Sequence, residues 1–176
     1  VAGGLMPVPM LNILNGGAHA ATNVDVQEFM VMPHGFDSFA EGLRAGVETY
    51  HSLKAELKAD GLLGGVGDEG GFCPNLPANE EGLKYMVRAI EGAGYSTEEM
   101  GIALDVAATE FHHEDGYHMD GRVLSSEDLA DVYSGWLDEY PIVSIEDGFG
   151  EDDWRGWTLF TKREGHRVQT VGDDLF

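Results

Sequence analysis

The sequence VSIEDG at residues 143–148 combines a short β-branched run with two carboxylates and a glycine. A β-branched run that ends at a glycine is typical of a strand leaving its sheet. Because side chains alternate along a strand, Ser144 and Glu146 are expected to share one face. A carboxylate at the end of an apolar strand is costly to desolvate unless it is paired or binds a cation. The stretch therefore predicts a buried strand with a candidate functional group at its end.

Two other segments repeat this pattern, IALD ending at Asp105 and VQTVGD ending at Asp173. Helical patterns separate the three, so this half of the chain has the order β-α-β-α-β, which predicts a parallel sheet with right-handed crossovers. In a parallel α/β barrel the carboxyl ends of the strands converge on one mouth. Three convergent carboxylates, including Glu146, suit a hard, oxygen-seeking cation such as Mg²⁺. The alternative interpretation is a solvated turn at each strand end.

The first hundred residues predict a β-β-α-α start, with strands at 8–14 and 24–32. Ser38 and Glu41 have the spacing of a helix capping box. The helix that follows has a stripe of apolar residues, interpreted as core: Phe39, Leu43, Val47, Tyr50, Leu53 and Leu57. The next helix has its own stripe: Leu83, Met86, Val87 and Ile90. The fold class is therefore α/β. If the barrel is incomplete, its first and fifth strands would be unpaired edges, which favour aggregation or pairing with another chain.

Two glycine-rich segments are candidate ligand loops. NGGAHA at residues 15–20 allows close backbone approach to a ligand beside His19, which could serve as an acid, a base or a hydrogen-bond donor. GGVGDEGG at residues 64–71 surrounds the acidic Glu69 with glycines and lacks the lysine of a phosphate-binding P-loop. The alternative interpretations are a loop histidine and a flexible connection.

Three further histidines, His112, His113 and His118, are interpreted as part of an irregular, solvated loop, with a turn at Asp120-Gly121. A metal site is the less favoured alternative for these three residues.

Composition limits the possible functions. The chain of 176 residues has 32 acidic and 10 basic residues, a formal net charge of −22, which argues against binding nucleic acid or an anionic membrane. We expect adaptation to high salt, since screening would relieve this self-repulsion; an acidic mesophilic surface is the alternative. One cysteine, Cys73, and no apolar run of roughly 20 residues indicate a cytoplasmic protein without membrane insertion.

Six segments together resemble the enolase family: residues 11–20, 27–30, 67–71, 104–105, 144–148 and 172–175. Their order and separations make the resemblance specific. It implies that residues 1–176 are an incomplete C-terminal barrel domain, a partial enolase-type TIM barrel that ends near its fifth strand, without the N-terminal domain and the last strands. It also implies a glycolytic lyase that dehydrates 2-phosphoglycerate to phosphoenolpyruvate with Mg²⁺, commonly as a homodimer.

The resemblance also implies roles for individual residues. Asp105, Glu146 and Asp173 would bind Mg²⁺, and Glu146 and Asp173 would also face the substrate. Glu69 would be the general acid, assisted by Glu28. The substrate pocket would be completed by His19 and Gln27 together with Glu28, of which Gln27 and Glu28 are expected on opposite faces of one strand.

The catalytic base of the family is a lysine on a later strand than any in this chain, so we expect these 176 residues to be inactive alone. Two alternatives remain. The chain could belong to another dehydratase of the enolase superfamily, or to a non-catalytic protein that binds metal or a partner.

Overall fold

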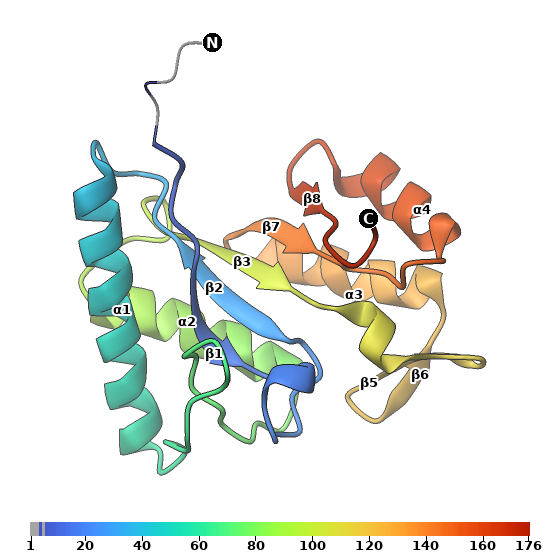
Figure 1. The fold of residues 1–176 in the computed structure, drawn as a ribbon, viewed down its shortest axis with the longest axis horizontal. Coiled ribbons are helices and arrows are strands. Elements are labelled where there is room, and N and C mark those ends of the chain that lie inside the picture. Colours follow the sequence, from blue (N-terminus) through green and yellow to red (C-terminus); the bar gives the residue numbers. More distant parts are fainter. Residues whose placement is uncertain (1–3, 5) are drawn as a thin grey trace.

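A five-stranded sheet in the order β1-β2-β3-β7-β8 forms the centre of the molecule (Figure 1). The structure, a computed structural model, describes residues 4 and 6–176. The strands are β1 (Leu11–Asn15), β2 (Glu28–Met32), β3 (Gly101–Asp105), β7 (Ile142–Glu146) and β8 (Gln169–Val171). β2 is antiparallel to both of its neighbours, whereas β3, β7 and β8 are parallel. The predicted α/β class and the partial barrel are confirmed, and the sheet does not close on itself.

Four helices pack in two neighbouring pairs outside this sheet, α1 with α2 and α3 with α4 (Figure 1). Their bounds are α1 (Phe39–Ala59), α2 (Asn79–Gly92), α3 (Ser126–Glu139) and α4 (Trp154–Glu164). Short 3₁₀ turns occupy η1 (Gly17–His19) and η2 (Ala108–Phe111), and a small sheet contains β4 (His112–His113), β5 (Gly116–Met119) and β6 (Arg122–Leu124). The predicted β-β-α-α start and the β-α-β-α-β continuation are therefore confirmed.

The stripe predicted as core on α1 is buried only in its second half. Leu53 and Leu57 are fully buried, but Leu43 and Val47 are 41% and 44% exposed. The first half of α1 instead buries small residues, and a Cβ added to Gly46 would lie 2.7 Å from a methyl of Leu11. The small side chains let the helix backbone approach β1 closely. The predicted helical period holds along α1, but in the first half of the helix the buried face differs from the predicted one.

The predicted strand ends and caps also need adjustment. β2 begins at Glu28, so the segment 24–27 is not strand, and β1 begins at Leu11. The Ser38 side chain accepts a hydrogen bond from Glu41 N, whereas a reciprocal capping box forms at Ser125 on α3. The outer edge of β1 is not fully open, because Phe72 forms two backbone hydrogen bonds with it, one to Ile13 O and one from Asn15 N.

The prediction of an irregular histidine loop is wrong, because residues 112–124 form the sheet β4-β5-β6. Turn residues explain the difference. Asp120 and Gly121 both have positive φ (50° and 70°) and form the two-residue connection between β5 and β6, as their sequence indicated. Gly116, at φ 133°, opens β5 with a backbone conformation that other residues rarely adopt.

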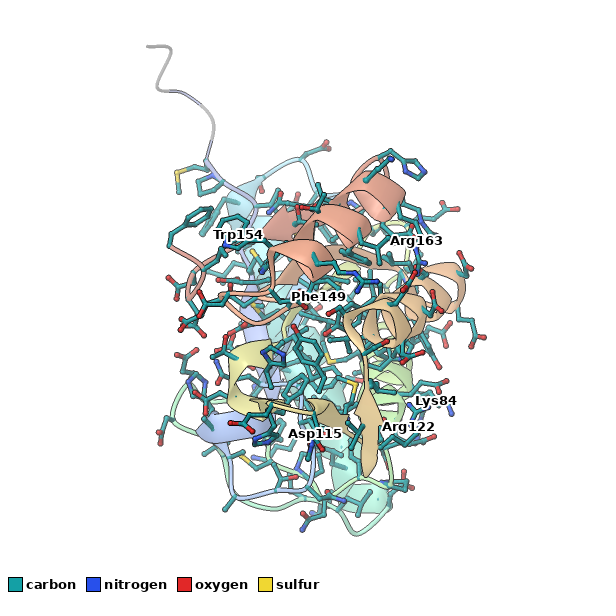
Figure 2. All side chains as sticks on the ribbon, turned by 90° about the vertical axis from the view of Figure 1, so that its right-hand side faces the viewer. Lys84, Asp115, Arg122, Phe149, Trp154 and Arg163 are labelled. Carbon is teal, nitrogen blue, oxygen red and sulfur yellow. The ribbon has the colours of Figure 1, made fainter. Side chains whose placement is uncertain are left out.

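An aromatic cluster centred on Phe149 fixes the segment that follows β7. Phe149, labelled in Figure 2, lies edge-on to Tyr117, Tyr133 and Trp157. All four rings are buried. Tyr133 donates a hydrogen bond of 2.9 Å to Gly148 O. These contacts hold the chain rigidly just after the last residue of β7, Glu146, and so fix the direction in which that strand end points.

Candidate active site at the strand ends

Three carboxylates lie side by side where the central strands meet. Asp105 pairs with Glu146 in the parallel register of β3 and β7, and with Glu28 in the antiparallel register of β2 and β3. Because β2 runs the other way, its first residue lies at the same end of the sheet as the last residues of β3 and β7. Residues that pair directly across strands place their side chains on the same face. The register therefore brings together residues that lie far apart in sequence.

Gln27 joins this row from outside the strand. Its side-chain amide donates a hydrogen bond of 3.1 Å to Asp105 Oδ2. The expectation that Gln27 and Glu28 lie on opposite strand faces does not hold, because the strand begins only at Glu28 and its alternation does not extend to Gln27.

Asp173 lies two residues beyond β8, and Asp147 controls its position. The buried Asp147 carboxylate accepts hydrogen bonds from the backbone N–H groups of Asp173, Asp174 and Leu175 over 2.9–3.4 Å. Asp147 itself has a φ of 42°, which turns the chain sharply away from β7. Sequence reasoning missed this role, although the acid that directly follows Glu146 was visible in the opening stretch.

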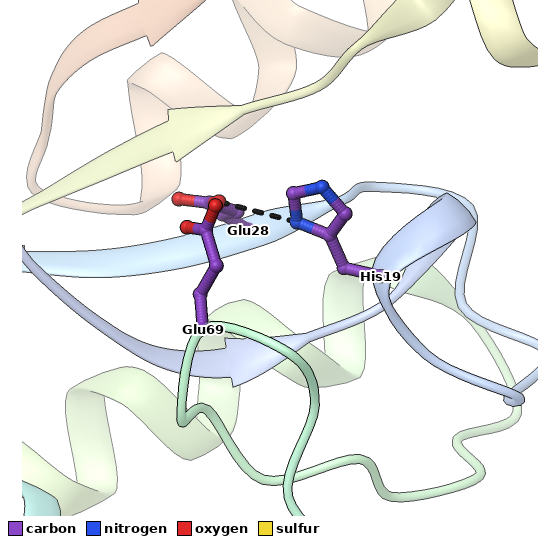
Figure 3. Close-up of side chains that lie close together, drawn as sticks. All are labelled: His19, Glu28 and Glu69. Carbon is purple, nitrogen blue, oxygen red and sulfur yellow. Dashed lines mark ion pairs between the residues drawn. The ribbon is translucent and has the colours of Figure 1, made fainter.

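Glu28 belongs to a second group with His19 and Glu69 (Figure 3). Ligand atoms of these three side chains all lie within 4.8 Å of one another, and His19 Nδ1 is 3.4 Å from Glu28 Oε1. Among the described residues this is the one group of histidines, cysteines and acids gathered so closely. The predicted set of Asp105, Glu146 and Asp173 is not drawn together to that extent.

The loop that carries Glu69 is anchored. Gly67 N donates 2.8 Å to Gly71 O, which closes a short turn around Glu69. Gly70 has a φ of 90°, and its carbonyl accepts a hydrogen bond of 3.1 Å from the Tyr50 hydroxyl on α1. The Tyr50 ring stacks on Phe72, 4.5 Å between centroids, next to the backbone bonds to β1. The loop therefore holds Glu69 over Glu28.

Burial without a positive partner dominates the electrostatics of the site. Burial, and to a lesser extent the neighbouring acids, raises the pKa of Glu28 to about 8, that of Asp105 to about 6 and that of Glu146 to about 7. The pKa of Glu69 is lowered, because its carboxylate accepts a hydrogen bond from the Glu28 carboxyl. None of the ten lysines and arginines lies on the five central strands. The site is thus a concentration of acids in which the pKa of Glu28 is raised and that of its neighbour Glu69 is lowered.

Comparison with known proteins agrees with the barrel-type sheet and the acids at its strand ends. The family profile described as "Enolase, C-terminal TIM barrel domain" matches residues 4–176. The chain belongs to the enolase family. It is 54% identical over 177 residues to the enolase of a Nitratiruptor species and 56% identical over 175 residues to that of Wolinella succinogenes. The alignments cover 99% and 97% of this chain but 42% of each relative, so the chain spans less than half the length of these enolases.

A further network of this enolase-family chain, which sequence reasoning missed, supports the start of β2. The buried Asn79 side chain accepts hydrogen bonds from the backbone N–H groups of Asp25 and Val26, over 2.8 and 2.9 Å. Its amide nitrogen donates to the carboxylates of Asp25 and Asp120. The segment just before Gln27 is thereby fixed to α2 and to the β5-β6 turn. Of the residues in this network, the sequence indicated only Asp120, which adopts a positive φ in its Asp-Gly turn.

Two expectations about the environment can be compared with the structure. Within the described residues, no helix has both the length and the apolar character that a membrane span requires. Cys73 is a free thiol of intermediate exposure, and burial raises its pKa, which argues against a reactive thiolate.

Proposed function

We propose that the intact protein containing this chain is an enolase, which dehydrates 2-phosphoglycerate to phosphoenolpyruvate with Mg²⁺. One observation carries the proposal. Glu28, Asp105 and Glu146 form an uncompensated row of carboxylates at one end of the sheet, and a glycine-rich loop holds Glu69 over it. Buried carboxylates without a positive partner are costly and are typical of sites that bind a cation.

Asp105, Glu146 and Asp173 would hold the Mg²⁺, and their chemistry fits this ion. All three offer only carboxylate oxygens, the donors that Mg²⁺ prefers. The raised pKa values of Asp105 and Glu146 reflect missing positive charge, which a divalent cation would supply. When bound, Mg²⁺ would provide the concentrated positive charge needed where a carboxylate substrate gains a second negative charge.

The general acid would be Glu69, with Glu28 as its proton partner. Departure of the substrate hydroxyl requires a proton from an acid placed within hydrogen-bond reach. The raised pKa of Glu28, about 8, supports a role for the pair, because the Glu28 carboxyl holds a proton at neutral pH beside Glu69 and could supply it to that residue. His19 and Gln27 would contact the substrate from two sides of this pair, and Glu146 and Asp173 would face it from the metal side.

The base would come from a lysine outside this chain, as the enolase family implies. The fold supports this view, since the lysines of the chain lie on helices and not on the strands that carry the acids. We therefore propose that the 176 residues bind Mg²⁺ but do not turn over 2-phosphoglycerate by themselves.

The experiment is an assay of phosphoenolpyruvate formation by the intact protein, by its Glu69→Gln variant and by the 176-residue chain, with contaminating enolase excluded. We expect Mg²⁺-dependent turnover by the intact protein, a loss of about 10²–10⁴-fold on Glu69→Gln, and none by the chain. Asp68→Asn, which changes the adjacent acid, is the matched control. Mg²⁺ binding by the intact protein without turnover would support the non-catalytic alternative, and turnover of an acid sugar in place of 2-phosphoglycerate would support another dehydratase of the superfamily.

The proposal extends to the setting of the protein. A cytoplasmic protein adapted to high salt is consistent with a single cysteine and a net charge of −22, and a homodimer is what membership of the enolase family implies. Adaptation to salt predicts a melting temperature that rises between low and molar KCl. A melting temperature that does not change would favour an ordinary acidic surface.

A further inference from the structure

The small sheet β4-β5-β6 carries three of the seven histidines of the chain at fixed strand positions. His112 pairs with Tyr117, and His113 pairs with Gly116 at the end of the hairpin. Because side chains alternate, His113 and His118 lie on the same face of the hairpin, opposite to His112 and Tyr117. A two-residue turn, Glu114-Asp115, connects the strands beside them.

The two histidines on this face already contact one another and an acid. The His113 and His118 rings are 4.4 Å apart between centroids, and His118 Nε2 lies 2.8 Å from Asp115 Oδ1. The side chains of His118 and Asp115 are 44% and 63% exposed, and Asp115 lies at the surface in the view of Figure 2. Their donor atoms are therefore accessible from solvent.

The opposite face holds this hairpin in place. The His112 ring stacks on Tyr117 at 4.2 Å, and the Tyr117 hydroxyl donates 2.7 Å to Asp153 Oδ2 at the start of α4. The same hydroxyl accepts a hydrogen bond from Gly150 N. Tyr117 thus ties the hairpin to the aromatic cluster, so that the backbone beneath His113 and His118 is supported by a buried contact. Ligands on supported strands are placed more accurately than ligands on free loops.

We propose that His113, His118 and Asp115 form a surface site for a borderline divalent cation such as Zn²⁺ or Ni²⁺. Imidazole nitrogens suit these ions and not Mg²⁺, which selects oxygen donors. The ligand atoms of the three residues are not yet all within 4.8 Å of one another, so binding requires rotation about exposed side-chain bonds, which have several accessible rotamers. Water would complete the coordination, and the net charge of −22 would raise the local cation concentration.

The test is isothermal titration of the intact protein with ZnCl₂, in the presence of Mg²⁺ at a concentration that saturates its oxygen site. The group His19, Glu28 and Glu69 could bind a second Zn²⁺. The titration is therefore repeated with the His19→Gln variant, which lacks the imidazole of that group and keeps both histidines of the hairpin. On that background, His113→Gln and His118→Gln are each expected to weaken Zn²⁺ binding by at least about tenfold. The exposed His166, which lies outside the hairpin, gives the matched control His166→Gln.

The outcomes separate clearly. Circular dichroism of each variant verifies that the fold is kept, as expected for substitutions at exposed positions. Unchanged affinity and stoichiometry in both His113→Gln and His118→Gln would overturn the proposal. Displacement of the remaining Zn²⁺ by further Mg²⁺ would also overturn it, because such competition indicates a carboxylate site without imidazole ligands.

Discussion

Two buried glutamates of this chain have opposite surroundings. Glu164, at the end of α4, is 5% exposed and accepts hydrogen bonds from Ser134 Oγ and from Arg167 Nε, both over 2.6 Å. Glu28, at the strand-end site, is 8% exposed and faces mainly other acids. The pKa of Glu164 is lowered, chiefly by the hydrogen bond from Arg167, whereas that of Glu28 is raised to about 8. The fold supplies a positively charged partner to the buried carboxylate of Glu164, but within the described residues it supplies no arginine or lysine to the carboxylates at the strand ends.

This difference separates stability from function. Removing one partner of a paired buried acid destabilises the native state, because the other partner is left unsatisfied. An unpaired group of acids contributes only when a cation arrives. We therefore expect substitutions in the two regions to have opposite effects on stability and on metal binding.

The largest effect is expected from Asp105→Asn in the intact protein. Replacing one carboxylate ligand should weaken Mg²⁺ binding by about 10–100-fold or more and lower turnover correspondingly. The matched substitution Glu164→Gln should leave both unchanged, since Glu164 lies away from the strand ends. Titration calorimetry with MgCl₂ and an activity assay measure the two effects. Equal Mg²⁺ affinity in Asp105→Asn and the unmodified protein would remove Asp105 from the proposed ligands.

A substantial loss of stability is expected from Glu164→Ala. It removes the buried acceptor of Ser134 and Arg167, and we expect the free energy of unfolding to fall by about 2–3 kcal/mol. Urea denaturation at neutral pH measures it. Glu28→Gln, which removes an acid with a raised pKa, should instead be neutral or stabilising under the same conditions. A larger loss for Glu28→Gln than for Glu164→Ala would contradict the comparison.

A smaller effect is expected on the pH dependence of stability. The pKa values of Asp105, Glu146 and Glu28 are raised to about 6, 7 and 8, so the folded state binds more protons than the unfolded state between about pH 4 and 8. Their contribution therefore decreases the stability of the chain as the pH rises through this range. Melting temperatures measured from pH 5 to 8 should show this decline, and saturating Mg²⁺ should reduce it. A decline that is the same in a Glu28→Gln/Glu146→Gln double variant would exclude Glu28 and Glu146 as its origin.

The smallest effect is expected from Tyr50→Phe, which deletes the hydroxyl that holds Gly70 O next to Glu69. A single hydrogen bond at the surface contributes about 1 kcal/mol, so turnover of the intact protein should fall a few-fold with little change in melting temperature. The ring should keep its stacking on Phe72. Kinetics at saturating substrate measure the change. Unchanged turnover would show that the glycine-rich turn positions Glu69 without help from α1.

Much of the fold could be predicted because local pattern and global arrangement agree. The apolar runs before Asp105 and Glu146 became strands, and Ser38 begins a helix and accepts a hydrogen bond from Glu41 N, as its spacing indicated. The face of α1 could not be predicted from apolar residues alone. Its first half packs through Gly42, Ala45 and Gly46, and small residues give no hydrophobic signal although their spacing follows the helical period.

The candidate site was predictable as a set of residues but not as a geometry. Strand-end chemistry suggested Asp105 and Glu146, yet the roles of Asp147 and Asn79 depend on contacts between segments distant in sequence. The histidine hairpin was missed for a related reason. Its strands are very short, and turn geometry at Gly116 and Asp120, more than propensity, determines that they pair.

The antiparallel direction of β2 has a consequence for the order of events in folding. Gln27 and Asp105, which share a hydrogen bond in the site, are 78 positions apart in the chain. Ordering a loop of that length is slow compared with forming a helix, so contacts of this kind form late. During synthesis, Gln27 and Glu28 are made first. They can form their part of the site only after the β3 segment has been synthesised and has paired with β2. The carboxylates thus come close together only after the surrounding structure can hold them, and a nascent chain avoids their mutual repulsion until then.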